Sequence, residues 1–401
     1  MSPQDTSTAL VVTTTVLSTV AFLAIARALL YPVRPKTIRN PLKAGVYDKA
    51  NADKLKNLVY HPDQFPGARD VETPYGSIRV YEFGPEDGEK VLFVHGISTP
   101  CITLGPIALG LAKRGYRVML FVSFLLSAYS RSPAWLMSLE DLFGRGFSDG
   151  VADIPHDARL YVSQMLLVLA SSPLAWTGTD AFRLVGYSLG GGIAVHFANA
   201  FPNLVRDLVL LAPAGLIRAA SFGRVSRFLF VSGLVPERIL AVATRSRLQK
   251  PIASSAKPPP KTPIEAVTTP PLNVAEAEVA PASGEAVTPL EQRVMEYVRW
   301  MVTHHNGFVP AFMSSIRFAP LTDQHEAWAK LSKRAPGTTA ILLARSDEII
   351  DPDSYRRDAL SLVGGEHHVR WRILPGSHDF VMTHAGDILS EIDDMFKTNK
   401  I

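Results

Sequence analysis

A mostly parallel, doubly wound α/β sheet is the fold class that the sequence predicts, and two observations lead to it. Short apolar runs alternate along the chain with stretches that have helical periodicity. Several runs, such as Lys90–Val94, are apolar on both faces. Strands have this composition when helices cover both sides of a parallel sheet, so we expect helices on both faces.

The composition allows a large core and limits the partners. The chain has 401 residues, of which 47% are hydrophobic and 19% charged, with a formal net charge of +4. This length allows two or three domains, or one large α/β domain with insertions. Lys and Arg form no long basic run, so we expect no nucleic-acid partner. Cys101 is the only cysteine, which excludes an intrachain disulfide and a metal site of several thiolates.

The N-terminal residues suit a membrane. After a tail over 1–8, the residues from Ala9 to Ala26 carry no charge. A helix over 9–31 would span roughly 30 Å, about one bilayer. Basic residues follow it and none precedes it, so the positive-inside rule places the remainder in the cytosol. We expect a single-pass transmembrane anchor, with the endoplasmic reticulum as one candidate membrane. A helix in the membrane interface or buried against the domain is the alternative.

Strands and helices alternate after this anchor. A Pro-containing tether, 32–60, leads to the first part of the core, 61–215, and a second part covers 323–398. We expect strands over 77–83, 90–94, 116–121, 182–186, 208–211, 339–343 and 369–373. We expect helices over 102–114, 156–170 and 190–200.

The segment 216–322 interrupts the alternation, and we expect it to form a helical cap over the carboxyl edge of the sheet. Its flanks, 228–243 and 292–304, have helical patterns. Between them, residues 250–291 are rich in Pro and Ala and contain no aromatic residue. Such a stretch cannot bury enough apolar surface to become ordered, so we expect a disordered insert.

A second interruption, Val122–Glu140, separates the strand ending at Phe121 from a Gly-rich loop that begins at Asp141. Without it, the strand would run directly into the loop. We interpret the segment as a translated intron. The alternative is a genuine extra loop that faces the membrane with its Phe, Leu and Trp residues. A major transcript that retains the segment would contradict the intron.

The motif with the clearest chemistry is Gly186-Tyr187-Ser188-Leu189-Gly190, between an expected strand and an expected helix. A nucleophilic serine must project from a tight turn, and glycine two residues to either side removes the collisions there. The helix that follows directs its N–H groups at the reaction centre. Ser188 is therefore our candidate nucleophile, the alternative being a turn that uses serine as a helix cap.

A serine hydroxyl needs a base, and the base needs a group that holds its tautomer. Asp347 and His378 each follow a late strand, at the edge where an open α/β sheet forms its ligand crevice. We expect Ser188, Asp347 and His378 to meet as a catalytic triad. The rival acids are Glu348, Asp351 and Asp353.

An oxyanion hole is expected at the same edge. His95-Gly96-Ile97-Ser98 follows an early strand, and the N–H of Ile97 can join that of Leu189 around a developing oxyanion. Losing one such donor typically costs about 3 kcal/mol of transition-state stabilisation. Gly96 is a further glycine of this loop, and we expect His95 to orient it.

The remaining histidines and the cysteine give no metal site. His304-His305 and His367-His368 have no carboxylate or thiol at ligand spacing, so we expect solvated or packing roles. Cys101 has no basic neighbour and is expected to be a small buried apolar residue. We expect neither a metal nor an organic cofactor.

The order of these motifs along the chain makes it resemble the α/β-hydrolase superfamily. The resemblance covers about residues 69–398, apart from the two interruptions. The resemblance is to lid-bearing serine esterases and lipases, including membrane-anchored monoacylglycerol-lipase-like enzymes. It implies Ser188 as nucleophile, His378 as base and acid, and Asp347 as the group that orients His378. It also implies hydrolysis of carboxylic esters through an acyl-enzyme. The apolar cap helices and the membrane anchor favour lipophilic esters, such as acylglycerols, as substrates. The family's structural loop is matched by Asp141, Gly144, Gly146 and Ser148.

Other functions remain compatible with these motifs. Carbon–carbon bond hydrolases, hydroxynitrile lyases and cofactor-free haloperoxidases use the same triad. Epoxide hydrolases and dehalogenases carry Asp where this chain has Ser188, which argues against both. An alternative from a different class is a catalytically inactive membrane scaffold that binds partners through its Pro-rich segment.

Overall fold

A computed structural model describes residues 3–30, 35–45, 69–120, 141–177, 181–218, 235–249 and 287–399. The interruption Val122–Glu140 and residues 250–286 of the predicted insert lie outside these ranges.

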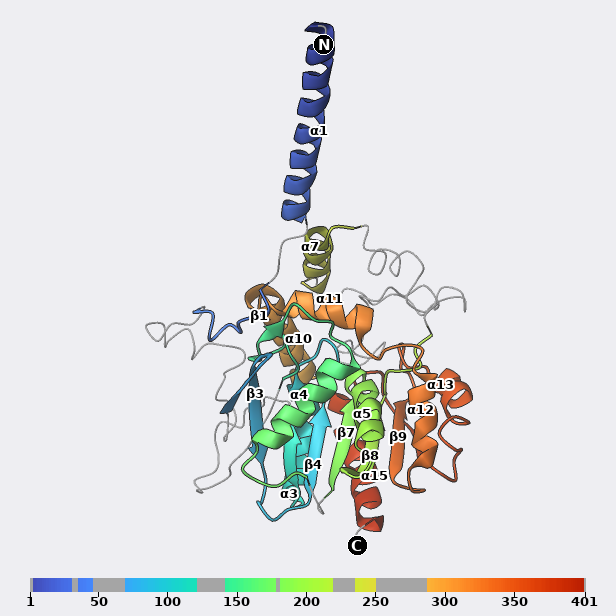
Figure 1. The fold of residues 1–401 in the computed structure, drawn as a ribbon. Helices are drawn as coiled ribbons and strands as arrows, with labels where there is room; N and C mark the ends of the chain where they lie inside the picture. Colours follow the sequence, from blue (N-terminus) through green and yellow to red (C-terminus); the bar gives the residue numbers. More distant parts are fainter. Residues whose placement is uncertain are drawn as a thin grey trace.

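An eight-stranded sheet forms the centre of the molecule, in the order β10-β9-β8-β7-β4-β5-β3-β2 (Figure 1). The strands from β4 and β5 to β10 pair in parallel, whereas β3 runs antiparallel to both β5 and β2. The predicted, mostly parallel sheet is therefore confirmed. The strands are β2 (Arg69–Thr73), β3 (Gly76–Phe83), β4 (Lys90–Val94), β5 (Arg117–Leu120), β7 (Phe182–Tyr187), β8 (Val205–Leu211), β9 (Thr339–Ala344) and β10 (Arg370–Leu374).

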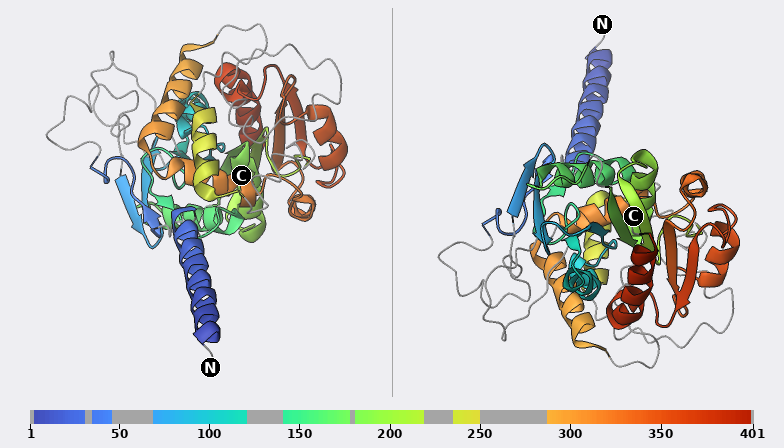
Figure 2. Two further views of the ribbon diagram at one scale, coloured as in Figure 1. Left: turned by 90° about the horizontal axis from the view of Figure 1, so that it is seen from above. Right: turned by 90° about the horizontal axis from the view of Figure 1, so that it is seen from below.

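Helices cover both faces of the sheet, as a doubly wound fold requires (Figure 2). On one face, α3 (Gly105–Lys113) packs beside α15 (Ala385–Thr398). On the other face, α5 (Leu189–Ala200) packs between α4 (Ala158–Ser171) and α12 (His325–Ala329). Shorter elements complete the core, namely η2 (Cys101–Leu104), η5 (Lys330–Lys333), α13 (Pro352–Ala359) and α14 (Phe380–Thr383).

The segment predicted as a cap contributes α7 (Glu237–Leu248), α10 (Pro289–His304) and α11 (Phe308–Phe318), which lie across the carboxyl ends of the strands (Figure 1). A capping box starts α10, since the Thr288 hydroxyl accepts from the Glu291 N–H while the Glu291 carboxylate accepts from the Thr288 N–H. This reciprocal cap satisfies two otherwise unpaired N–H groups. The helix thus begins inside the range predicted to be disordered, and that boundary was wrong.

The apolar N-terminal residues form one long helix, α1 (Pro3–Leu30), which extends away from the core on the side of the cap, next to α7 (Figure 1). Within it, Leu10–Leu30 has a mean hydropathy of 1.8 and no buried side chain. The hydroxyls of Thr14, Thr15 and Thr19 donate to carbonyls one turn earlier, which satisfies them within the helix. The helix is therefore long and apolar enough to cross a membrane, although a signal sequence meets the same criterion.

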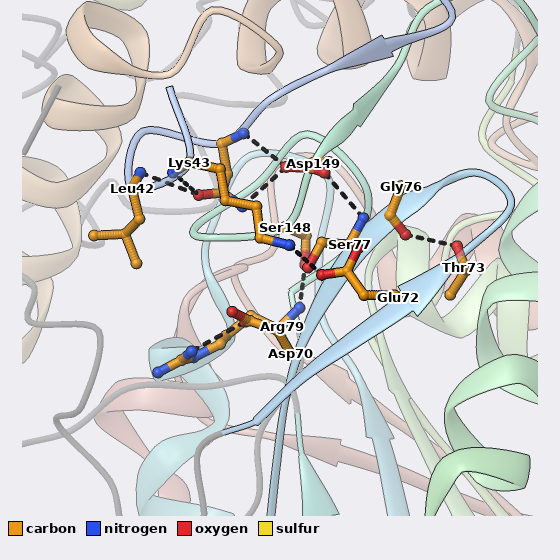
Figure 3. A network of polar contacts seen from close by, with 11 residues as sticks. Leu42, Lys43, Asp70, Glu72, Thr73, Gly76, Ser77, Arg79, Ser148 and Asp149 are labelled. Atoms are coloured by element: carbon orange, nitrogen blue, oxygen red, sulfur yellow. Dashed lines mark hydrogen bonds and ion pairs between the residues drawn. The ribbon is translucent and has the colours of Figure 1, made fainter. Parts of the chain in front are cut away.

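The range predicted as a tether is partly docked on the core. Strand β1 (Thr37–Ile38) pairs antiparallel with β6 (Gly150–Val151). Beside it, the backbone N–H and side-chain amide of Asn40 donate to Asp149 Oδ1 at 2.7 and 2.9 Å. The other oxygen of Asp149 accepts from the Ser77 N–H at 2.9 Å, which extends this network to β3 (Figure 3). Only residues 31–34 separate the end of α1 from the docked segment that starts at 35.

Candidate active site

Ser188 occupies the turn between β7 and α5 in a strained conformation. Its φ of +53° and ψ of −121° lie in a region that residues other than glycine rarely adopt. A Cβ on Gly186 would lie 2.4 Å from the carbonyl oxygen of Gly190, and one on Gly190 would lie 2.1 Å from that of Val94. A side chain at either position would collide with these oxygens. Both residues must therefore be glycine for the turn to project the hydroxyl of Ser188.

The structure brings the three predicted triad residues together. Nε2 of His378 lies 3.0 Å from Oγ of Ser188, and its Nδ1 lies 2.7 Å from Oδ2 of Asp347. The second carboxylate oxygen, Oδ1, accepts from the N–H groups of Ile349 and Ile350, both at 2.8 Å. The carboxylate thus accepts the Nδ1 proton and leaves Nε2 to take the serine proton.

The rival acids do not take this place. Asp351 caps α13 by accepting from the Ser354 N–H at 2.8 Å. Glu348 and Asp353 have exposed side chains. Asp347 differs from them because only 6% of it is exposed, and a buried carboxylate keeps a fixed orientation.

The loop predicted to form the oxyanion hole lies beside the serine, because Val94 pairs with Gly186 in the sheet. His95 is fully buried in it, with Nε2 accepting from the Leu142 N–H at 3.1 Å and Nδ1 2.8 Å from the Gly96 carbonyl. Nδ1 therefore carries the proton and donates it to Gly96. Burial, with a smaller contribution from the nearby cation of Arg145, lowers the pKa of His95 to about 3.

His95 therefore stays neutral and orients the loop. Ile97 is fully buried, and Leu189 is the first residue of α5, where an N–H group has no acceptor within the helix.

The other singled-out residues have structural contacts. His305 is buried, accepts from the Gly307 N–H at Nδ1 (3.0 Å) and has its Nε2 2.9 Å from the Ser148 carbonyl. Burial lowers the pKa of His305 to about 4, which fits a packing role. Cys101 is buried as expected, but its thiol donates to Asp141, so it is not simply an apolar residue. Within the described ranges, no group of three His, Cys, Asp or Glu residues is placed to hold a metal.

Sequence reasoning missed a contact between two carboxyl groups beside the site. Asp379, which follows His378, and Glu291 of α10 are 2% and 0% exposed and contact each other. One oxygen of each has a donor: Asp379 Oδ1 accepts from Ser377, and Glu291 Oε2 accepts from Thr288. The remaining oxygens, Oδ2 and Oε1, are buried and have no donor among the described residues. A single shared proton would satisfy both.

Burial, and then the Glu291 carboxyl, raise the pKa of Asp379 to about 8. The folded state then holds a proton that an unfolded Asp, with a pKa near 3.8, has lost. We therefore expect stability to fall as the pH rises from about 4 to about 8.

We expect Glu291→Gln to remove this loss. The Thr288 N–H holds the amide oxygen, so the amide nitrogen faces Asp379 and donates to its carboxylate. The melting temperature of the variant should exceed that of the wild type by a margin that grows between about pH 4 and pH 8. Each kcal/mol of difference in unfolding free energy should appear as roughly 2–4 °C. Thermal unfolding followed by circular dichroism measures it. Glu296→Gln, an exposed change on the same helix, should leave the pH dependence unaltered. Parallel curves for Glu291→Gln and the wild type would contradict the shared proton.

Comparisons with known proteins give the following likenesses. No family model matches the chain. Uncharacterized proteins from Mycobacterium tuberculosis and Mycobacterium bovis are 26% identical over 167 residues, which are 41% of this chain and 41% of each relative. The chain therefore matches about two fifths of the length of these curated relatives.

Among solved structures, a membrane phospholipase A described as a bacterial virulence factor has a TM-score of 0.54 at 16% identity, with 96% of this chain and 99% of that chain covered. A carboxylesterase from Bacillus subtilis has a TM-score of 0.54 at 14% identity, with 82% and 90% covered. At such identities the likeness shows a shared fold.

Proposed function

Since the chain has the α/β-hydrolase fold, we propose that it is a membrane-anchored serine hydrolase that cleaves lipophilic carboxylic esters. The observation that carries the proposal is the chain of contacts from Ser188 through His378 to Asp347, with distances of 3.0 and 2.7 Å. The strained turn at Ser188 and the loop beside it support the same chemistry.

The reaction would proceed through an acyl-enzyme. Oγ of Ser188 attacks the ester carbonyl carbon while Nε2 of His378 takes the hydroxyl proton. The carbonyl electrons move onto the oxygen, which the N–H groups of Ile97 and Leu189 would stabilise. The intermediate collapses, and the alcohol leaves with the proton from His378. Water then attacks the acyl group, gives a proton to His378, and the second collapse releases the acid and restores Ser188.

The surface of the cap supports a lipophilic substrate. Ile239 and Val242 are 54% and 69% exposed on one face of α7, and Phe318 at the end of α11 is 51% exposed. These helices lie on the side from which α1 extends (Figure 1). With α1 in a bilayer, these helices would lie close to the same bilayer, from which an acylglycerol could reach the site.

A substrate panel tests this function. Purified in detergent, the full chain should hydrolyse acyl esters, and rates should rise from short to longer acyl groups because longer chains bury more apolar surface. A fluorophosphonate probe should label the wild type and not Ser188→Ala. Turnover of carbon–carbon bond substrates without ester hydrolysis would favour that alternative chemistry. Failure of the probe to label the wild type would favour the scaffold.

Membrane attachment is a separate prediction. Deleting residues 1–34 should move the protein from the alkaline-resistant membrane fraction to the soluble fraction, because it removes the whole 21-residue span Leu10–Leu30, and about 20 apolar residues are needed to cross a bilayer. Deleting residues 1–8 alone should leave it in the membrane. Fractionation and immunoblotting with a C-terminal tag measure both. A shortened wild-type chain in the soluble fraction would identify a cleaved signal sequence and contradict the anchor.

A further inference from the structure

Arg145 is a fully buried arginine that the mechanism above does not use. It lies in the Gly-rich loop between Gly144 and Gly146. Its Nε and one terminal nitrogen both donate to the carbonyl oxygen of Ile97, at 3.1 and 3.0 Å. This two-point grip holds the residue whose N–H is predicted to bind the oxyanion.

The remaining donors of Arg145 fix the guanidinium itself. One terminal nitrogen donates to the Phe143 carbonyl at 2.9 Å and to the Tyr161 hydroxyl at 3.2 Å. The other also donates to Ser315 of the cap helix α11 at 3.0 Å. All these acceptors are carbonyls or hydroxyls, and no carboxylate in the described part of the chain forms an ion pair or hydrogen bond with Arg145. Among the described residues, its buried charge therefore has no paired anion.

Two side chains thus hold consecutive peptide groups of the loop. His95 holds the Gly96 carbonyl at 2.8 Å, and Arg145 holds the Ile97 carbonyl. In a trans peptide the C=O and the following N–H point in opposite directions. By holding the Gly96 carbonyl, His95 therefore directs the Ile97 N–H, which belongs to the same peptide group. By holding the Ile97 carbonyl, Arg145 fixes the next peptide group, between Ile97 and Ser98.

We propose that Arg145 is a positioning residue of the oxyanion hole. By holding the Ile97–Ser98 peptide group it keeps in place the Ile97 N–H that His95 directs, and its charge adds positive potential to this loop. The inference rests on the proposed serine hydrolase function. A buried cation acts strongly on nearby charge because little water screens it. The electrostatic part of this role is specific to Arg145, since the second holder, His95, is neutral.

The test compares Arg145→Met, which removes charge and grip, with Arg145→Lys, which keeps the charge and one donor. For Arg145→Met we expect kcat to fall by about 10²–10³-fold, the size of losing one oxyanion donor, with KM within about threefold. Arg145→Lys should recover part of this loss. The affinity for an alkylboronic acid, which forms a tetrahedral anion on Ser188, should fall with kcat. An ether analogue of the ester, which carries no oxyanion, should bind equally well.

Two controls separate positioning from stability. Ser315→Ala removes a cap contact of Arg145 but leaves its grip on Ile97, so kcat should stay near the wild-type value. Arg183→Lys makes the matching replacement at another buried arginine, near the start of β7, where Asp207 and Glu89 are its partners. It should lower the melting temperature without changing kcat.

Four outcomes would contradict the positioning role of Arg145. A folded Arg145→Met variant with kcat within about threefold of the wild type would overturn the inference. If Arg145→Met does not fold, an unchanged kcat in Arg145→Lys overturns it equally. Failure of both to fold would assign Arg145 a purely structural role. A wild type without Ser188-dependent turnover would instead overturn the proposed function and this inference with it.

Discussion

Ser188→Ala is expected to lower kcat/KM for ester hydrolysis by about 10⁵–10⁶-fold, since removing the nucleophile of a serine–histidine pair has an effect of this size. The hydroxyl makes one side-chain contact among the described residues, with His378 at 3.0 Å, so the fold should not depend on it. Hydrolysis of a chromogenic ester, together with the melting temperature, measures both effects.

The matched control is Ser332→Ala. This serine has an exposed hydroxyl that donates to the Ala329 carbonyl at 2.7 Å, so activity should not change. Residual activity of more than about 1% in a purified Ser188→Ala variant would show that the serine is not the nucleophile.

Asp347→Asn is expected to lower kcat by about 10⁴-fold, because an amide would impose the wrong histidine tautomer. The N–H groups of Ile349 and Ile350 both donate to Oδ1, so the amide oxygen must occupy that position. The amide nitrogen then faces Nδ1 of His378 as a donor. Nδ1 must accept, Nε2 must carry the proton, and no base faces Ser188. Steady-state kinetics with a chromogenic ester measures the loss.

The rival acid Asp351 provides the control. Asp351→Asn keeps an oxygen for the Ser354 N–H that it caps, so kcat should remain close to the wild-type value. A larger loss in Asp351→Asn than in Asp347→Asn would reverse the assignment of the acid.

Much of the site could be predicted because each of its reactive residues lies in a local sequence pattern that indicates its role. Ser188 stands between a strand and a helix with a glycine two residues to either side, and Asp347 and His378 each follow a late strand. Parallel strands bring such endings to one edge, so their meeting followed from the sheet. By contrast, β2 was missed because Arg69–Thr73 is a half-exposed edge strand without an apolar run.

The contacts that could not be predicted join distant parts of the chain. Arg145 bonds to residues 48 positions before and 170 positions after it, and only the folded loop and cap bring these partners together. Asp379 meets Glu291 for the same reason. Partial signals existed, since Asp379 adjoins His378 and the Thr288-x-x-Glu291 pattern indicates a capping box. Neither signal indicates that the two carboxyl groups touch.

The short connection between α1 and the docked strand β1 restricts where the proposed hydrolase could work. Residues 31–34, even fully extended, reach at most about 14 Å. With α1 inserted, the cap and the site beneath it could not move far from the membrane that holds α1. A lipophilic substrate would then arrive by lateral diffusion in two dimensions, and turnover would follow its mole fraction in that membrane and not its bulk concentration. Esters in a neighbouring vesicle would remain untouched until the two membranes fused.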